Sequence, residues 1–218
     1  MTLDFGPVLA QWPMWLRGIW LTCALTAGMM TLGTLLGIAC AWVRAQGPRW
    51  LTRSVGVYVE LFRNTPFIIQ LFFIFFGLPS LGVRFDPVTA SIIALVLDLG
   101  AYASEIIRAG IEATPRGQLE AAHSLALTRW QTFSRVVLPP SLERVWPALV
   151  SQIIIVMLVS AICSQISAKE ISFSADLISS RTFHSFESYF VATALYLGLA
   201  VLLRQFLNWF GPRFVFRR

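Results

Sequence analysis

The sequence predicts an all-α integral membrane protein with five transmembrane helices. Three observations support this prediction: the composition, the spacing of the charged residues and their uneven distribution between loops. Of the 218 residues, 56% are hydrophobic and only 13% are charged, whereas a soluble domain carries about 25% charged residues. The mean hydropathy of +0.70 is typical of a chain whose long segments avoid water, which argues against an ordinary soluble enzyme.

The gaps between charged residues locate the membrane spans. A helix needs about 20 residues to cross the roughly 30 Å hydrocarbon core. Uncharged runs of this order lie between Arg17 and Arg44, between Arg63 and Arg84, and between Arg144 and Lys169. Two further apolar runs are interrupted only by Asp98 and by Arg204. The five expected spans, which form a single domain over residues 1–218, are 18–43, 64–83, 87–108, 145–168 and 188–209.

The basic residues predict the orientation of these spans. In the expected topology all 17 basic residues lie on one side of the membrane except Arg17, Arg84, Lys169 and Arg181. Basic loops face the cytoplasm, so we expect the N-terminus outside and the C-terminus in the cytoplasm. The first apolar run exceeds the hydrophobic region of a signal peptide, and we expect it to remain as a span.

The longest cytoplasmic loop, 109–144, has the pattern of two short helices. Thr128 and Gln131 have the spacing of a capping box, which starts the second helix, and Pro139 and Pro140 are expected to end it. Two interpretations are open: a knob that fits a groove on a partner protein, or an amphipathic helix that lies on the membrane surface.

The same loop resembles the EAA motif of ABC importer permeases. It reads Glu120-Ala121-Ala122, three residues, Ala126, nine residues, Val136, one residue and Leu138-Pro139. The spacing agrees throughout, but Ala126 replaces the glycine of the motif and Val136 replaces its isoleucine. Further segments are similar to the permeases of the polar amino acid family (the histidine, glutamine and arginine type): 63–66, 70–73, 76–79, 101–102, 105–106, 108–111, 115–118 and 180–183. The fourth span departs from that family, because Leu158 begins a segment that often carries lysine.

The resemblance implies a type I ABC importer permease, a multi-pass protein of the bacterial cytoplasmic (inner) membrane. The implied function is ATP-driven import of polar amino acids or related derivatives. The implied partners are an ATP-binding cassette ATPase dimer, a second permease subunit that is a copy or a paralogue, an extracytoplasmic solute-binding protein and the lipid bilayer, but no nucleic acid. The chain contains no G-x-x-x-x-G-K-[ST] loop, so we expect ATP and Mg²⁺ on the partner ATPase, and no catalytic residue or cofactor here.

The residues expected to couple the chain to the ATPase are Glu120, Ala121, Ala122, Ala126 and Leu127. Small side chains allow a partner surface to approach closely, and a carboxylate at position 120 is placed to pair with a basic group of the ATPase. The alternative is that this carboxylate only complements the dipole of its own helix. Alanine in place of glycine at position 126 is expected to stiffen the junction between the two helices.

The residues expected along a solute path are Asn64, Asp98, Tyr102 and Ser160. A carboxylate in mid-span costs about 2.5 to 3.5 kcal/mol on insertion scales and normally faces a polar cavity. Tyr102 and Glu105 follow Asp98 at i+4 and i+7, on the same helical face. In the structural alternative, Asp98 pairs with a neighbouring helix and Glu105 pairs with Arg108. The side chains of Asn64 and Ser160 then satisfy backbone groups.

Two other functions remain open from the sequence. A non-transporting scaffold or sensor would use the loop 109–144 to dock a cytoplasmic protein. A membrane-embedded enzyme would need a cluster of ionisable residues, yet the chain contains neither an H-E-x-x-H motif nor a serine elbow. The two histidines and the three cysteines show no paired spacing, so no metal site is expected.

Overall fold

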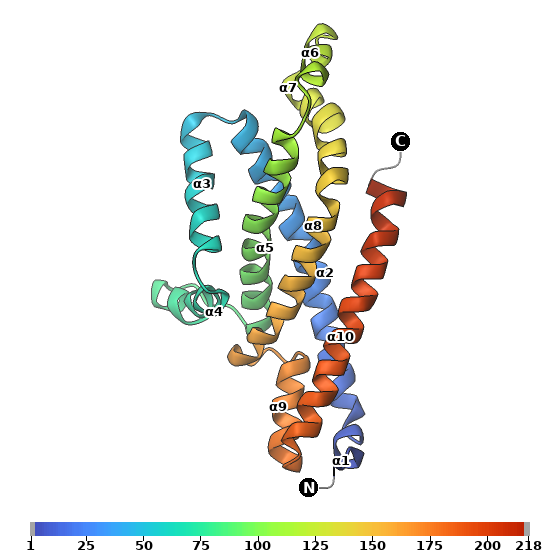
Figure 1. Ribbon diagram of the computed structural model, residues 1–218. Helices are drawn as coiled ribbons and strands as arrows, with labels where there is room; N and C mark the ends of the chain where they lie inside the picture. Colours follow the sequence, from blue (N-terminus) through green and yellow to red (C-terminus); the bar gives the residue numbers. More distant parts are fainter. Residues whose placement is uncertain (1–2, 216–218) are drawn as a thin grey trace.

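The computed structural model describes residues 3–215, and in this range the chain is helical without any strand (Figure 1). Four helical segments are long and apolar enough to cross a membrane: α2 (Trp12–Gln46), α5 (Pro87–Glu112), Arg129–Ile166 and Ser185–Arg213. A fifth span results if α3 (Arg49–Arg63) and the segment Phe67–Leu81 are counted as one bent unit. The all-α membrane architecture is therefore as the sequence predicts. Arg217 and Arg218, which were counted with the basic side, lie outside the described residues.

The remaining elements are short or belong to the long segments. They are α1 (Gly6–Leu9), α4 (Phe67–Phe72), η1 (Phe73–Gly77), η2 (Leu78–Leu81), α6 (Arg116–Ser124), α7 (Arg129–Gln131), η3 (Thr132–Val137), α8 (Leu138–Val159), η4 (Ser160–Ile166), α9 (Ile171–Thr182), α10 (Ser185–Phe210) and η5 (Gly211–Val215). Helices α6 and α7 project from one end of the bundle, whereas α1 and α9 lie at the opposite end (Figure 1).

Helix α5 lies at the centre of the bundle and packs on α2, α3 and α8. Lipid tails are as apolar as leucine, so close packing rather than removal from water holds such helices together. The G-x-x-x-G pattern of α2 serves this packing: a Cβ added at Gly33 would lie 3.0 Å from Leu99, and one at Gly37 would lie 2.6 Å from the Cβ of Ala103. The pattern therefore joins α2 to α5 within the subunit.

The second expected span, 64–83, is not one straight helix. The chain turns by 110° between α3 and the segment that follows it. Pro66 lacks a backbone N–H and keeps Thr65 out of the helical conformation, so α3 ends there. The side chains of Asn64 and Thr65 donate to the carbonyl groups of the last turn of α3, at 2.8 Å each, and Gln70 donates to a third at 2.8 Å. Polar side chains thus satisfy the carbonyl groups that the break exposes.

The prediction that Pro139 and Pro140 end the helix in the long loop is wrong. The chain stays helical from Arg129 to Ile166, so the helix that contains the fourth expected span begins well before residue 145. The π-helical turn η3 precedes these prolines, and they lie in the first turn of α8, where a backbone N–H is not required. Ser141 Oγ then donates to the carbonyl of Gly110 at 3.0 Å, which ties α8 to α5.

A buried carboxylate joins α9 to α10 at the end of the bundle near α1. Glu170 is fully buried. Its Oε1 accepts a hydrogen bond of 2.9 Å from the backbone N–H of Phe173 in the first turn of α9, and its Oε2 accepts one from the hydroxyl of Tyr196 in α10. Burial raises the pKa of the Glu170 carboxyl group above its ordinary value.

We call residues 113–131, which contain α6 and α7, the elbow. Its second helix starts with the predicted capping box: Gln131 N donates to Thr128 Oγ1 at 3.3 Å, and Thr128 N donates to Gln131 Oε1 at 2.9 Å. This reciprocal pair satisfies two backbone donors that have no partner inside the helix. The sequence therefore predicted the start of α7 correctly.

The turn between the two elbow helices ends α6 with a left-handed residue. Leu127 N donates to the carbonyl of Ala122 at 3.2 Å, and Ala126 N donates to that of His123 at 2.9 Å. This pair of bonds is a Schellman motif. Ala126 has a φ of 52°, a conformation that costs an L-residue about 1 to 2 kcal/mol and glycine almost nothing. The alanine therefore keeps the turn that the glycine of the EAA motif favours, but under strain.

We predict that Gly37→Ala destabilises the protein, because the added methyl group overlaps Ala103. Overpacking of this kind costs about 1 to 3 kcal/mol. Gly198→Ala is the matched control, since a Cβ at Gly198 in α10 meets no atom within 4 Å and alanine is the better helix former by up to about 1 kcal/mol. The thermal unfolding midpoint of the purified protein in detergent measures both effects. Equal midpoints for the two variants would contradict this account of the packing.

We predict that Ala126→Gly stabilises the elbow by about 1 kcal/mol, because glycine adopts the left-handed conformation without strain. Amide hydrogen exchange in α6 should slow by about fivefold, the equivalent of that free energy. Ala121→Gly, in the middle of α6, is the control and should speed exchange, since glycine is unfavourable inside a helix by about 1 kcal/mol. The strain assigned to Ala126 is refuted if both variants speed exchange alike.

Candidate functional site

The five expected coupling residues differ in their exposure on the elbow. Glu120, Ala121 and Ala126 are exposed, whereas Ala122 is buried and Leu127 is half-buried. Because helix α6 packs on η3, the buried alanine supports the elbow from inside. The exposed members form the part of this set that a partner can touch.

Two large apolar side chains of the elbow were not among the expected coupling residues. Leu125 is 73% exposed and Trp130 is 58% exposed. Leucine and tryptophan with this much exposed area on a projecting segment are typical of a protein contact. Their signal in the sequence is a large apolar residue on either side of the short segment 126–129 that joins the two elbow helices, and the EAA consensus does not include them.

Aromatic rings connect the elbow to the bundle. The ring of Trp130 lies edge-on to that of Trp42 in α2, with centroids 5.5 Å apart, and Phe133 in η3 lies 6.4 Å from the same ring of Trp42. On the other side, Arg144 and Ser141 of α8 both donate to the carbonyl of Gly110 in α5, each at 3.0 Å. These contacts tie the elbow and the segment that follows it to α2 and α5.

An ion-pair network joins α2 and α5 near the elbow. The carboxylate of Glu105 accepts hydrogen bonds from Arg44 of α2 and from Arg108 one turn further along α5, the latter at 2.9 and 3.1 Å. Arg108 also pairs with Glu112. The pair of Glu105 with Arg108 is the contact that the structural alternative describes. The carboxylate of Glu105 is therefore engaged by arginines and does not form a common site with Asp98.

Asp98 is buried in α5 with 6% of its surface exposed. Within residues 3–215, its carboxylate accepts no hydrogen bond. Tyr58 of α3, which the sequence did not single out, donates to the neighbouring carbonyl of Leu97 at 2.6 Å. Tyr102 instead faces the end of α3, where its hydroxyl lies 3.5 Å from the carbonyl of Arg63. An unpaired carboxylate that is largely buried is costly, and no residue between 3 and 215 supplies the polar partner that it needs.

The other two expected path residues contact their own helices. Asn64 Nδ2 donates to the carbonyl of Glu60 at 2.8 Å, and Ser160 Oγ donates to that of Met157 at 2.6 Å. Both contacts satisfy backbone groups, as the structural alternative describes. The structure thus leaves Asp98 as the one member of the expected path whose polar group lacks a hydrogen bond within the described residues.

The chain matches a known family over most of its length. Residues 33–216 match the family described as "Binding-protein-dependent transport system inner membrane component". The arginine transport system permease protein ArtQ of Bacillus subtilis is 32% identical over 204 residues, which cover 93% of each chain. The L-cystine transport system permease protein TcyB of the same organism is 37% identical over 170 residues, 78% of this chain and 73% of the relative.

Solved structures agree with these relatives. A crystal structure of an amino acid ABC transporter with histidines has a chain that is 33% identical to this one, with a TM-score of 0.86 and coverage of 98% of this chain and 100% of that chain. An inward-facing structure of the MetNI methionine ABC transporter has a TM-score of 0.72 at 23% identity, covers 96% of this chain and 99% of that chain, and shares the fold alone. The chain therefore belongs to the binding-protein-dependent transport system inner membrane components, the multi-pass permease subunits of ABC importers.

Proposed function

We propose that this permease subunit moves polar amino acids or related derivatives across the cytoplasmic membrane, driven by ATP that a separate ATPase hydrolyses. The observation that carries the proposal is the projecting elbow with its EAA-like residues, fused to one continuous helix from Arg129 to Ile166. The substrate class is supported by relatives that are named for the transport of arginine, cystine and glutamine. The elbow end faces the cytoplasm, and α1 faces outside.

The assembly contains three kinds of partner. An ATPase dimer, which binds ATP and Mg²⁺, docks on the elbow through the exposed Glu120, Ala121 and Ala126. A second permease subunit, a copy or a paralogue, completes the pathway, and an extracytoplasmic binding protein delivers the solute at the end opposite the elbow. The dependence on a binding protein is supported by the description of the family.

The elbow acts as a lever because α7, η3, α8 and η4 form one helical segment. Closure of the ATPase moves the elbow, and the contacts at Gly110 and Trp42 transmit the movement to α5 and α2. Trp42 Nε1, Thr114 Oγ1 and Thr132 Oγ1 are buried near the base of the elbow and lack a partner within the described residues. An unpaired buried polar group costs about 1 to 3 kcal/mol. A second position of the elbow, in which these three groups find hydrogen-bond partners, is therefore favoured over the present one by this contribution.

Solute passes Asp98. Its unpaired carboxylate is suited to the ammonium group or a cationic side chain of an amino acid. Because Asp98 lies in α5, which the lever moves through Gly110, the same displacement that opens the pathway alters the surroundings of the carboxylate.

Transport of solute distinguishes this function from a scaffold or sensor. The purified subunit, reconstituted in liposomes with its ATPase and binding protein, is expected to accumulate labelled amino acid only when ATP is present. ATP hydrolysis without accumulation of any polar amino acid would favour the scaffold or sensor. The family is one of transporters, which already speaks against a membrane-embedded enzyme.

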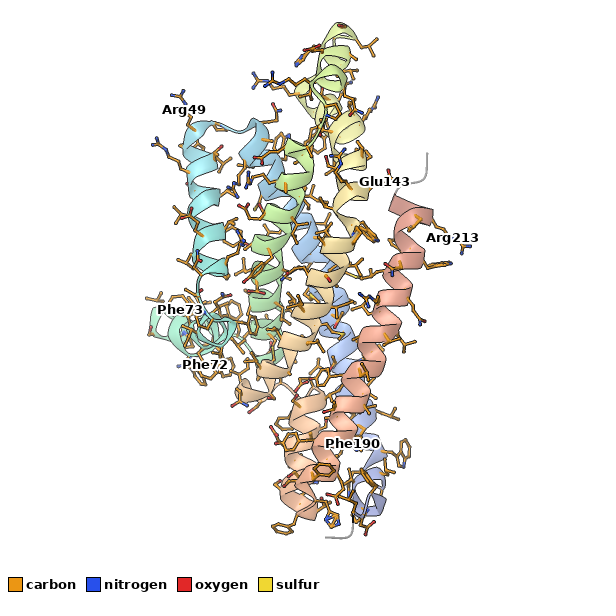
Figure 2. All side chains as sticks on the ribbon, in the orientation of Figure 1. Arg49, Phe72, Phe73, Glu143, Phe190 and Arg213 are labelled. Atoms are coloured by element: carbon orange, nitrogen blue, oxygen red, sulfur yellow. The ribbon has the colours of Figure 1, made fainter. Side chains whose placement is uncertain are left out.

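We predict that Glu120→Lys weakens assembly with the ATPase, because it reverses an exposed charge at the docking surface. Loss of a paired charge in an interface costs about 2 kcal/mol or more, which corresponds to roughly thirtyfold weaker binding. Co-purification of the ATPase measures the effect. Glu143→Lys, an exposed carboxylate on α8 outside the elbow (Figure 2), is the control and should leave co-purification unchanged. Equal recovery of ATPase with both variants would contradict docking at Glu120.

We predict that Asp98→Asn lowers the uptake of cationic amino acids relative to neutral ones, because asparagine removes the negative charge and keeps the shape. Competition between labelled arginine and labelled glutamine in the reconstituted importer measures this ratio. Ser160→Ala is the control: its hydroxyl serves the backbone, so the ratio should stay as in the wild type. An unchanged ratio in Asp98→Asn removes Asp98 from the solute path.

A further inference from the structure

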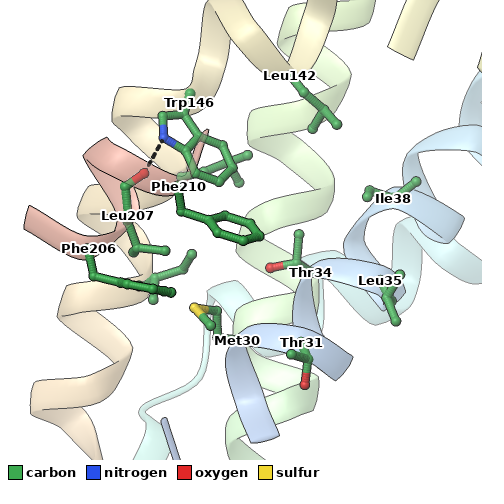
Figure 3. Close-up of a pocket in the computed structure, with 12 residues that line it drawn as sticks. Met30, Thr31, Thr34, Leu35, Ile38, Leu142, Trp146, Phe206, Leu207 and Phe210 are labelled. Carbon is green, nitrogen blue, oxygen red and sulfur yellow. Dashed lines mark hydrogen bonds between the residues drawn. The ribbon is translucent and has the colours of Figure 1, made fainter. Parts of the chain in front are cut away.

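An apolar groove lies between α2, α8 and α10, away from both the elbow and Asp98. Its larger cavity has a volume of about 390 Å³, and Figure 3 shows the side chains of the three helices around it. A neighbouring cavity of about 360 Å³ shares Met30 and Phe206 with it. Together they follow α2 from Cys23 to Ile38, a length of about 22 Å at 1.5 Å per residue. The groove is therefore long enough to hold an extended hydrocarbon chain.

The lining offers little to a polar ligand. Trp146 Nε1 donates to the carbonyl of Leu207 at 3.2 Å, so its N–H is engaged and its ring borders the cavity (Figure 3). The hydroxyl of Thr31 donates to the carbonyl of Ala27 at 2.8 Å. The hydroxyl of Thr34, which also lines the larger cavity (Figure 3), forms no hydrogen bond among residues 3–215. With one such hydroxyl in an otherwise apolar lining, the groove suits hydrocarbon rather than an amino acid.

The groove opens toward the outside of the bundle. In the most apolar stretch of the last helical segment, Ser185–Arg213, only 11% of the residues are buried inside the protein, compared with 61% in that of α5. In a membrane, the exposed apolar surface of a transmembrane helix contacts lipid tails. The medium around the protein therefore supplies an occupant that matches the groove.

A cation lies at the elbow end of the groove. Phe206, which lines both cavities, packs on Trp209 with ring centroids 6.4 Å apart, and the guanidinium of Arg213 lies 4.9 Å from the centroid of the Trp209 ring. Figure 2 shows Arg213 at the elbow end of the last helix. Arg213 forms no ion pair with any residue between 3 and 215.

We propose that this groove binds one acyl chain of an anionic phospholipid from the leaflet on the elbow side, with the lipid phosphate against Arg213. The guanidinium matches phosphate in charge and geometry, and a tryptophan beside it is typical of the membrane interface. The lipid fills the space that α2, α8 and α10 leave, and so holds α10 against the helix that continues the elbow.

Native mass spectrometry of the whole importer, extracted from membranes that contain phosphatidylglycerol and phosphatidylcholine, tests the site. We expect retention of phosphatidylglycerol over phosphatidylcholine by about fivefold, the preference that one arginine supplies near an anionic lipid. Met30→Trp fills the point where the two cavities meet and should abolish the retained phosphatidylglycerol. Leu197→Trp, at a 64% exposed position of α10 outside the groove, is the matched control and should keep it.

A second pair of variants tests the headgroup. Arg213→Gln should remove the preference for phosphatidylglycerol, whereas Arg204→Gln should preserve it, because Arg204 lies nine residues earlier in the chain, lines neither cavity and is not the arginine that contacts the Trp209 ring. Equal retention of the two lipids by the wild type would overturn the proposal, as would loss of the preference in Arg204→Gln alone.

A photoreactive amino acid in place of Phe206 distinguishes the occupants without a groove-filling substitution. Cross-links to phospholipid support the proposal even if Met30→Trp fails to fold. Cross-links to the second permease subunit would overturn it, because the groove would then belong to the subunit interface.

Discussion

The structure depends on the requirement that every backbone polar group within the bilayer find a partner in the protein. Continuous helices meet this requirement without help, and the interiors of α2, α5 and α10 are of this kind; α8 differs because Pro147 in its interior lacks a backbone N–H. Where the chain departs from them, side chains take over: Asn64, Thr65 and Gln70 bond the carbonyl groups at the end of α3. The sharp 110° turn after α3 is possible because these polar residues surround Pro66.

The same requirement explains the lever that the elbow forms. A π-helical turn, η3, lies directly before Pro139 and Pro140, so the helix passes them without interruption. A broken helix would have absorbed a displacement of the elbow at the prolines. The segment from Arg129 instead stays helical as far as η4, at the end of the bundle opposite the elbow (Figure 1), as the proposed coupling requires. The coupling proposed above therefore depends on how two prolines are accommodated, and two hydrogen bonds to the carbonyl of Gly110 tie the segment to α5.

Prediction from the sequence succeeded where the signal is local. Charge gaps located the apolar helices because a charge inside hydrocarbon is costly whatever its neighbours are. The capping box of Thr128 and Gln131 was predictable because both partners lie within one turn. The direction of the chain after α3 was not, since a gap between charges measures length and not angle. The pair of Glu105 with Arg108 was open to prediction because the two residues lie one turn apart, whereas the contact of Glu105 with Arg44 on another helix was not.

By itself, the sequence determined the membrane class and the family motif. The tertiary structure alone decided that Ala122 lies inside the elbow while Ala121 lies outside, that Ala126 takes a left-handed conformation, and that Asp98 has no partner within residues 3–215. The physical reason is one of range. Local polarity and the hydrogen bonds within one turn are determined by neighbouring residues. The burial of a side chain and its ion pairs or hydrogen bonds to other helices depend on segments that are distant in the sequence.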